Sequence, residues 1–117
     1  MTAAADYYDT NRAAMAPVRE AQPDLLKGFA GLHGAAMSAG ELDLRQKELI
    51  AFAVGLASRC ENCIYSHVRA ALKAGATAGQ VREAAGVAVL MGGGPVYTYL
   101  PRVEEALEAL RDRGESS

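Results

Sequence analysis

Residues 44–75 read LRQKELIAFAVGLASRCENCIYSHVRAALKAG, and this stretch indicates the fold class. Ala, Leu, Glu, Arg and Lys dominate it, β-branched residues are few, and apolar and polar residues do not alternate in steps of two. These features favour helix over strand. The stretch therefore predicts two helices of an all-α fold, which meet just before Cys60.

The first of these helices is expected to run from a cap at Asp43 to about Ser58. We interpret it as the central, buried helix, because apolar residues lie on nearly every side of it. They are Leu49, Ile50, Phe52, Ala53, Val54, Leu56 and Ala57. The second helix starts near Cys60 and continues to Gly75, which has the character of a left-handed glycine cap.

Two further helices are expected before this pair, over residues 6–21 and 24–38. Pro23 ends the first of them, because proline cannot continue a helix and restricts the residue before it. Asp24 is the expected N-cap of the second.

Two more helices are expected after the pair. Thr77 and Gln80 have the spacing of a capping box and open the fifth helix, which ends at the glycines of residues 92–94. Those glycines lack a following Lys-Ser/Thr, so they indicate a sharp turn; the alternative is close backbone approach to a ligand. Pro95 suits the first turn of the sixth helix, which we expect Pro101 to bend or divide. Its apolar repeat consists of Val103, Leu107 and Leu110.

The chain is expected to form one domain, a compact bundle of about six helices. A chain of 117 residues can bury roughly two-thirds of its unfolded surface in a single core. We expect the domain to span residues 1–117, with its core over 41–110 and a frayed end at 113–117.

Charge and hydropathy limit the partners. A net charge of −2 with intermixed signs provides no basic stripe for nucleic acid and no polybasic anchor for a membrane. The first residues lack the charged and apolar regions of a signal peptide, and no apolar run approaches a membrane span. We therefore expect a cytoplasmic protein that binds neither nucleic acid nor membrane.

Cys60 and Cys63 lie three residues apart at a helix start, where free backbone N–H groups and the helix dipole favour an anion. In a reducing compartment, such a pair is more typical of catalysis, redox sensing or metal binding than of a structural disulfide. Thiolates form more easily at this position, and thiol–disulfide exchange requires them. Arg59 would assist a thiolate here, whereas Glu61 would oppose it.

His67 lies one helical turn beyond Cys63 on the same face, within reach of proton exchange. Cys63 is therefore the better-placed nucleophile, and Cys60 is the natural resolving thiol, which closes the Cys60–Cys63 disulfide. Neither step requires a metal or another cofactor, and we expect none.

Glu48 carries a carboxylate toward the apolar interior and needs a partner there. If the third and fourth helices form an antiparallel hairpin, Glu48 lies roughly one turn from His67, a gap that a water can span. Glu48, His67 and Cys63 then form a proton relay. The alternative for Glu48 is a structural salt bridge, for which Arg82 and Lys73 are the candidate partners.

The cysteine pair also has alternatives. The two residues can be small buried hydrophobic residues of an Ala-rich helix. Cys60, Cys63 and His67 can instead bind zinc, with Glu48 or His33 as the fourth ligand. A structural zinc site more usually shows a second Cys or His pair, and His33 on its own indicates a partly exposed helix residue.

Several motifs together resemble the carboxymuconolactone decarboxylase and alkylhydroperoxidase D (AhpD-like) superfamily over about residues 41–110. They are Lys47-Glu48-Leu49-Ile50, the interval of twelve from Glu48 to Cys60, Cys60-x-x-Cys63-x-x-x-His67, the run AALKAGAT at 70–77 and the glycine turn before Pro95.

The resemblance implies an all-helical fold, a ring-like homo-oligomer of three or six chains, and thiol-dependent peroxidase or disulfide reductase activity. It assigns the peroxidatic thiol to Cys63, the resolving thiol to Cys60 and the relay to Glu48 and His67. The implied partners are a peroxide or disulfide substrate and a dithiol reductant, such as a lipoyl protein.

The chain departs from this pattern in two ways. Well-characterised peroxidase members carry a His directly before the second cysteine, where this chain has Asn62, and they contain two copies of the helical unit. The decarboxylase branch does not rely on a cysteine pair, so the cysteines here argue against a lyase. A redox-sensing module without catalytic activity is the remaining alternative. Independently of the resemblance, the apolar third helix and the Tyr97, Tyr99 and Leu100 cluster predict a homo-oligomer, with a hexamer favoured.

Overall fold

The computed structural model describes residues 1–115, which form eight helices and no strand. The all-α prediction is confirmed. The helices are α1 (Ala3–Ala14), α2 (Ala16–Ala21), α3 (Pro23–Met37), α4 (Leu44–Ala57), α5 (Glu61–Lys73), α6 (Ala78–Gly92), α7 (Gly94–Tyr97) and α8 (Leu100–Asp112).

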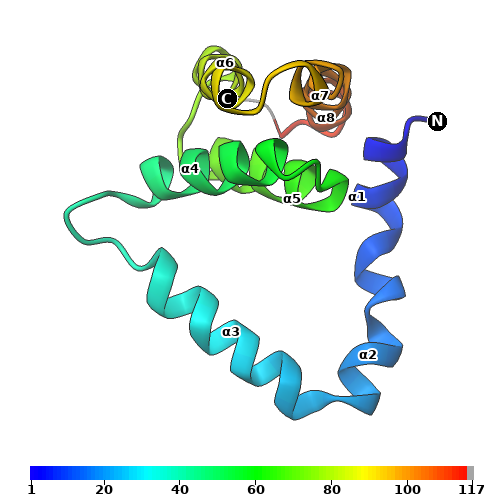
Figure 1. Cartoon of the computed structure of the whole chain (residues 1–117). Coiled ribbons are helices and arrows are strands. Elements are labelled where there is room, and N and C mark those ends of the chain that lie inside the picture. Colours follow the sequence, from blue (N-terminus) through cyan, green and yellow to red (C-terminus); the bar gives the residue numbers. More distant parts are fainter. Residues whose placement is uncertain (116–117) are drawn as a thin grey trace.

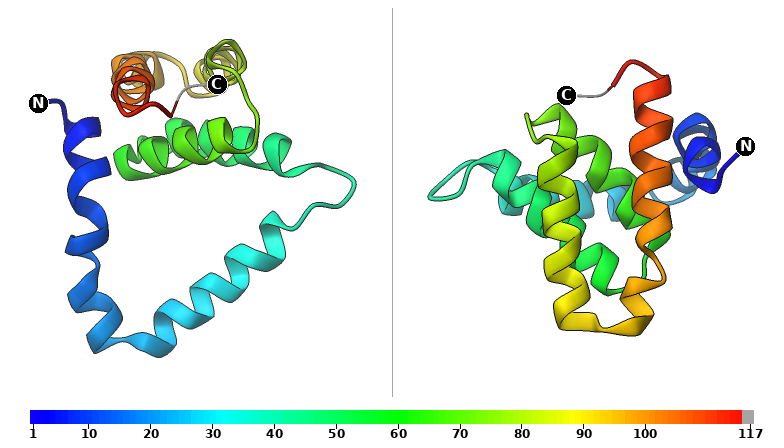
Figure 2. Two further views of the ribbon diagram at one scale, coloured as in Figure 1. Left: turned by 180° about the vertical axis from the view of Figure 1, so that it is seen from behind. Right: turned by 90° about the horizontal axis from the view of Figure 1, so that it is seen from above.

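The helices α4, α5, α6 and α8 form two layers, with α1 against one end (Figure 1). In the first layer α4 and α5 pack as an antiparallel hairpin, and α6 and α8 lie across it as the second layer (Figure 2). Apolar side chains from both layers fill the space between them, as expected for packed amphipathic helices. The largest fully buried ones include Phe52, Leu56, Ile64, Val68 and Leu110.

The helix α4 is buried on one face only. Phe52 and Leu56 face the core, whereas Ile50 is 51% exposed and Val54 is 60% exposed. The interpretation of this helix as wholly buried is therefore wrong for the single chain. Within residues 1–115, no other helix packs against this outer face to cover these two side chains.

Side-chain capping explains where α4 and α6 begin. Asp43 accepts a hydrogen bond from the backbone N–H of Gln46 at 2.8 Å, and Thr77 accepts one from Gln80 at 3.1 Å, each within a complete capping box. Gly75 follows α5 with a φ of 102°, as predicted for a left-handed glycine at the end of the helix. These local signals were sufficient to locate both ends of the α5–α6 connection.

The first expected helix is divided at Met15 into α1 and α2. Pro17 lies in the first turn of α2, where it donates no backbone hydrogen bond and its ring would clash with the carbonyl of residue 13 in a continuous helix. The next helix begins at Pro23 after Gln22, so Asp24 lies in its first turn and is not the N-cap.

The helix α1 is fastened to α5 through its tyrosines. The Tyr8 hydroxyl donates a hydrogen bond to the Tyr65 carbonyl at 2.7 Å, and burial raises the pKa of Tyr8, which keeps this donor protonated. Tyr7 and Tyr8 also contact the Tyr65 ring, with centroids 5.6 and 6.3 Å apart. These contacts fix the second turn of α5 from outside.

The helix α3 leaves the bundle as an arm and returns through residues 38–43 to the start of α4 (Figure 1). None of its residues is buried. The Cα radius of gyration of 14.4 Å accordingly exceeds the value of about 13 Å expected for a compact chain of this length. Lys47 holds the end of the arm, because its Nζ donates hydrogen bonds to the carbonyls of Ala36 and Ser38.

Pro101 divides the sixth expected helix, as predicted, into the short α7 and the longer α8. Gly93 forms the preceding turn with a φ of 73°. The chain end differs from the expected fraying, because the Arg113 guanidinium pairs with Asp9 at 2.8 Å and Glu115 pairs with Arg69 at 2.7 Å. Residues 116–117, to which the same expectation applied, lie outside the described residues.

Candidate active site

The chain reverses between α4 and α5 through Arg59, which adopts a left-handed conformation with a φ of 56°. The Cys60 backbone N–H donates to the Gly55 carbonyl at 3.0 Å, and the Arg59 N–H donates to the Leu56 carbonyl at 2.9 Å. This arrangement is a helix C-cap in which a residue other than glycine takes the left-handed position. It places Cys60 directly before the first turn of α5.

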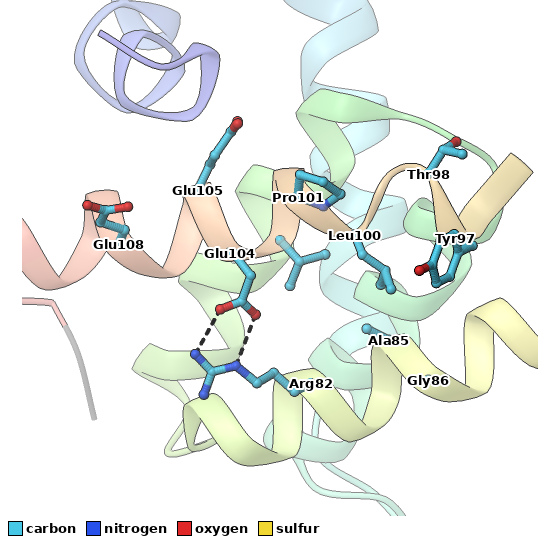
Figure 3. A pocket seen from close by; sticks show the side chains of 11 residues that line it. Arg82, Ala85, Gly86, Tyr97, Thr98, Leu100, Pro101, Glu104, Glu105 and Glu108 are labelled. Atoms are coloured by element: carbon cyan, nitrogen blue, oxygen red, sulfur yellow. Dashed lines mark hydrogen bonds and ion pairs between the residues drawn. The ribbon is translucent and has the colours of Figure 1, made fainter.

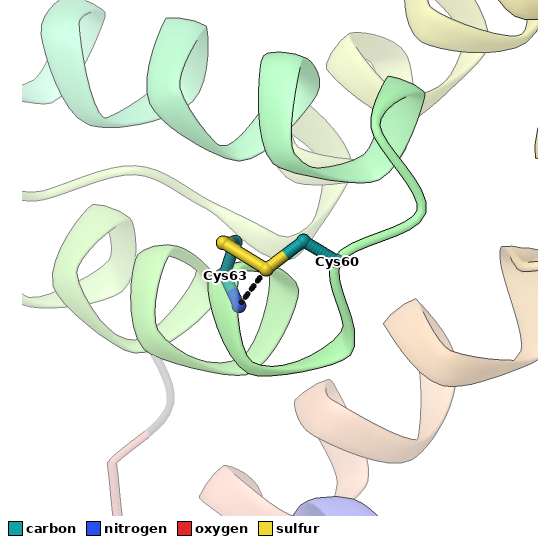
Figure 4. Close-up of a disulfide and its surroundings, with 2 residues drawn as sticks. All are labelled: Cys60 and Cys63. Atoms are coloured by element: carbon teal, nitrogen blue, oxygen red, sulfur yellow. Dashed lines mark hydrogen bonds between the residues drawn. A yellow bond between two sulfur atoms is a disulfide. The ribbon is translucent and has the colours of Figure 1, made fainter.

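Cys60 is the N-cap of α5. Its Sγ accepts a hydrogen bond from the Cys63 backbone N–H at 3.2 Å, and the two sulfurs form a disulfide with the Cα atoms 5.2 Å apart (Figure 4). Both residues are partly exposed. The pair is thus neither buried as an apolar contact nor shielded from a reacting partner.

Gly55 allows α4 and α5 to approach closely at the disulfide. A Cβ on Gly55 would lie 2.8 Å from the Cβ of Cys63, a distance that packed side chains do not adopt. The absent side chain therefore sets how near Cys63 lies to α4. Nothing in the local sequence pattern identified this role.

Glu48 and His67 are in direct contact. Oε1 of Glu48 lies 2.7 Å from Nδ1 of His67, and their side chains are 6% and 23% exposed. The expectation that a water bridges these groups is therefore wrong, because the hairpin register brings them together without one. The contact orients the imidazole through Nδ1 and leaves its Nε2 for another partner.

An ion pair that sequence reasoning did not identify lies beside the start of α5. Nε of Arg102 in α8 donates to Oε1 of Glu61 at 3.2 Å, and the same guanidinium lies 4.9 Å from the centroid of the Tyr99 ring. Burial raises the pKa of Tyr65, and the negative charge of Glu61 raises it further. No local sequence pattern indicates this ion pair, because Glu61 and Arg102 are 41 residues apart in the chain.

The structure does not bring the remaining candidates to the disulfide. His33 lies exposed on α3. Arg82, a suggested partner of Glu48, pairs with Glu104 at 2.9 Å instead, and Lys73 is exposed at the end of α5. Residues 1–115 contain no group of three or more His, Cys, Asp or Glu side chains arranged to hold a metal ion.

A groove of about 940 Å³ lies between α6 and α8 (Figure 3). The Arg82–Glu104 ion pair crosses it, and its wall is otherwise largely apolar. Its lining includes Ala85, Tyr97, Leu100, Pro101 and Val103. Because none of its lining residues is Glu48, Cys60, Cys63 or His67, we do not assign the chemistry to this groove.

Taken together, the residues around α5 suit thiol chemistry. A thiolate on Cys60 would accept the hydrogen bond that the disulfide sulfur already accepts at the helix N-terminus. The Glu48–His67 pair supplies a proton acceptor one turn beyond Cys63. No helix in residues 1–115 has the length and apolar character needed to cross a bilayer.

Comparison with known proteins gives a consistent family match. The model of the carboxymuconolactone decarboxylase family matches residues 23–112. An uncharacterized protein of Cupriavidus necator is 35% identical over 91 residues, which cover 78% of this chain and 80% of that protein. Uncharacterized protein 4 of the cox locus of Paracoccus denitrificans is 34% identical over 98 residues, covering 84% of this chain and 88% of that protein.

Two solved structures share the fold. A carboxymuconolactone decarboxylase family protein from Legionella pneumophila superposes with a TM-score of 0.77 at 38% identity, over 90% of this chain and 91% of that one. A Thermotoga maritima protein of the same family, described as a candidate for the antioxidative response, has a TM-score of 0.71 at 32% identity. That alignment covers 77% of this chain and 93% of the other.

Proposed function

The chain belongs to the carboxymuconolactone decarboxylase family, and from this premise we propose that it is an AhpD-like thiol oxidoreductase that reduces a peroxide or a disulfide. One observation carries the proposal. A Cys60–Cys63 disulfide caps α5, and the hydrogen-bonded Glu48–His67 pair belongs to the same α4–α5 hairpin. A purely structural disulfide would not need a buried carboxylate paired with a histidine beside it.

In the proposed cycle the reduced enzyme begins with a thiolate on Cys63, whose proton passes to His67. The thiolate attacks one peroxide oxygen, the O–O bond breaks, and the other oxygen leaves as alcohol or water. Cys63 is then a sulfenic acid. The Cys60 thiolate attacks its sulfur, releases the oxygen as water, and forms the Cys60–Cys63 disulfide.

A dithiol completes the proposed cycle. One thiolate of the dithiol attacks Cys63, the Cys60–Cys63 bond breaks, and its electron pair leaves on Cys60. The second thiol of the reductant then releases Cys63 as a thiol and becomes half of a new disulfide. A lipoyl protein has the required dithiol chemistry, and a reducing, cytoplasmic compartment would supply it.

The Asn62 amide bears on the choice between peroxide and disulfide substrates. Asn cannot titrate, so the position directly before Cys63 contributes no acid or base to the departing oxygen of a peroxide. Thiol–disulfide exchange does not need that proton transfer from the helix. The antioxidative role suggested for the Thermotoga maritima relative supports the peroxide substrate, and both reactions use the same cysteines.

The proposal is tested by adding a hydroperoxide to the reduced protein and following both the thiols and the metal content. We expect two thiols to be lost per chain, a Cys60–Cys63 disulfide in the mass spectrum, and recovery of the thiols with dihydrolipoamide. Stoichiometric zinc with unreactive thiols would support a metal site instead. Oxidation without turnover under excess dihydrolipoamide would support the redox-sensing module.

A further inference from the structure

An ion pair between two helices lies next to the disulfide. Glu61 directly follows Cys60 in the first turn of α5, and the Arg102 guanidinium approaches it from α8. The side chains of Arg102 and Glu61 are 37% and 42% exposed. Tyr99, the residue that precedes α8, lies 4.9 Å beneath the guanidinium and helps to hold it.

Glu61 is an unfavourable neighbour for a thiolate. The helix N-terminus stabilises a negative charge on the Cys60 sulfur, but a carboxylate on the next residue repels that charge. A cation that pairs with Glu61 offsets most of this repulsion, because the two opposite charges then act on the sulfur together. Arg102 is the cation that the fold supplies to Glu61.

We propose that Arg102 is a positioning residue that neutralises Glu61 and thereby allows Cys60 to ionise at the start of α5. This inference rests on the proposed function, because in the proposed cycle the ionised Cys60 acts as the leaving group and as the resolving thiol. When a dithiol attacks Cys63, the S–S bond breaks and its electron pair moves to Cys60. A stabilised thiolate on Cys60 makes that departure easier.

The other charged groups near the pair do not replace Arg102. Arg59 precedes Cys60 with an exposed side chain, and it makes no ion pair within residues 1–115. Glu48 and His67 are occupied with each other on the α4 side. On the α8 side, Glu105 is a carboxylate that raises the pKa of Tyr65, so it supplies no positive charge in place of Arg102.

The experiment uses Cys63→Ser, in which Cys60 is the sole thiol, and follows thiolate absorbance near 240 nm against pH. Adding Arg102→Met should move the midpoint of Cys60 ionisation upward, with roughly threefold less thiolate at a pH below the midpoint. Adding Glu61→Gln should move it downward. With both substitutions the midpoint should return close to its starting value.

Opposite shifts distinguish charge compensation from damage to the fold, because lost packing would move both variants in one direction. Arg102→Lys keeps the charge and should preserve the midpoint. Arg82→Met removes the comparable Arg82–Glu104 pair between α6 and α8, and it should leave Cys60 unaffected. Circular dichroism confirms that each variant is folded.

An unchanged midpoint in Arg102→Met, or equal shifts in Arg102→Met and Glu61→Gln, would overturn the inference. The measurement needs no substrate turnover. A wild-type protein that fails to consume peroxide or disulfide would therefore refute the proposed function separately, without obscuring the effect of Arg102 on ionisation.

Discussion

At the scale of single residues, Glu48 provides a direct test of the proton relay. Glu48→Gln keeps the size and hydrogen-bonding capacity of the side chain but removes its charge, so the imidazole of His67 loses its anionic partner. We expect turnover of peroxide or disulfide to fall by roughly 100-fold or more with the fold preserved. Steady-state kinetics and thermal denaturation check the two parts.

Glu48→Leu is the matched control for that variant. It should be as inactive as Glu48→Gln and should also lower stability, because removing one partner of a buried pair leaves His67 without its hydrogen-bond acceptor. Full activity in Glu48→Gln would instead assign Glu48 a structural role.

The two cysteines should differ in their reactions. Cys63→Ser should abolish reaction with peroxide, because serine offers no thiolate at neutral pH. Cys60→Ser should react once and then stop as a sulfenic acid or mixed disulfide on Cys63, detectable by mass after trapping with a sulfenic-acid reagent. His67→Ala should slow that single reaction and shift its pH dependence upward.

Reversed roles would appear as a trapped adduct on Cys60 in the Cys63→Ser variant. A zinc site predicts a third pattern, in which both serine variants lose metal and stability together and neither accumulates an adduct.

Sequence reasoning identified the residues of the hairpin but not all of their contacts. Cys60, Cys63 and His67 share a face because of helical spacing, which is readable from the sequence. The direct Glu48–His67 contact depends on the register between α4 and α5. The sequence does not give the length of the turn between them, so it predicts this register only to within about one helical turn. Arg102 approaches Glu61 through tertiary packing, for which no local pattern exists.

At the scale of helices, Gly55 controls the spacing of α4 and α5. Gly55→Ala would force its Cβ against that of Cys63 at 2.8 Å, so we expect a loss of about 1–3 kcal/mol in unfolding free energy. Slower cysteine chemistry should accompany it, because Cys63 must move. Denaturant unfolding and thiol oxidation rates measure both effects.

Gly86→Ala serves as the control for Gly55→Ala. Gly86 lies inside α6 with no atom within 4 Å of an added Cβ, so alanine there should stabilise the helix by about 0.5–1 kcal/mol. Equal effects of the two substitutions would show that Gly55 does not set the separation of α4 and α5.

The chain after α8 should contribute stability that depends on pH. Arg69 binds Glu115 through two hydrogen bonds, of 2.8 and 2.7 Å, and this pairing holds the pKa of Glu115 below its usual value. A lowered folded-state pKa means that the contribution is present above about pH 4.3, the unfolded value, and is lost as the pH falls through the folded value.

Glu115→Gln should therefore lower the midpoint of thermal unfolding at pH 7 by an amount that corresponds to about 1 kcal/mol or less, and it should match the wild type at strongly acidic pH. Glu108→Gln, which breaks no ion pair within residues 1–115, is the control. A constant difference between Glu115→Gln and the wild type across the pH range would contradict the assignment.

Helix boundaries were predictable where local chemistry sets them, as at the capping boxes and Gly75. The boundaries were not predictable where two local signals, a helical pattern and a proline, favour different positions. Pro17 broke an otherwise helical pattern, and Gln22 took the N-cap position because Pro23 suits the first turn of α3.

At the scale of the whole molecule, the distribution of apolar residues indicates more than one chain. The helix α3 has 15 residues and none of them is buried. Its large apolar side chains Leu25, Phe29 and Leu32 are each more than 60% exposed. A second uncovered set lies on the outer faces of α4 and α6. It contains Ile50, Val54, Val87, Leu90 and Met91.

Sequence periodicity could identify these residues as apolar but could not show that the same chain leaves them uncovered. An isolated helix that is apolar and solvated on all sides is not stable in water, because most helix stability in proteins comes from packing. Exposed patches of this extent instead mark association surfaces. Since both sets occur on every copy, identical chains can cover one another's sets in a closed, symmetric assembly.

We therefore predict a homo-oligomer, with six chains favoured over three. Light scattering coupled to size-exclusion chromatography should give the mass of a hexamer or trimer at micromolar concentration. Phe29→Glu places a carboxylate in the middle of the exposed face of α3, so it should dissociate the assembly if α3 is buried between chains. Lys27→Glu introduces the same charge at a polar position of the same helix and should leave the mass unchanged. A wild-type monomer would contradict the prediction. A wild-type oligomer that Phe29→Glu leaves intact would place the interface on α4 and α6 rather than on α3, because only those helices then retain an uncovered apolar face.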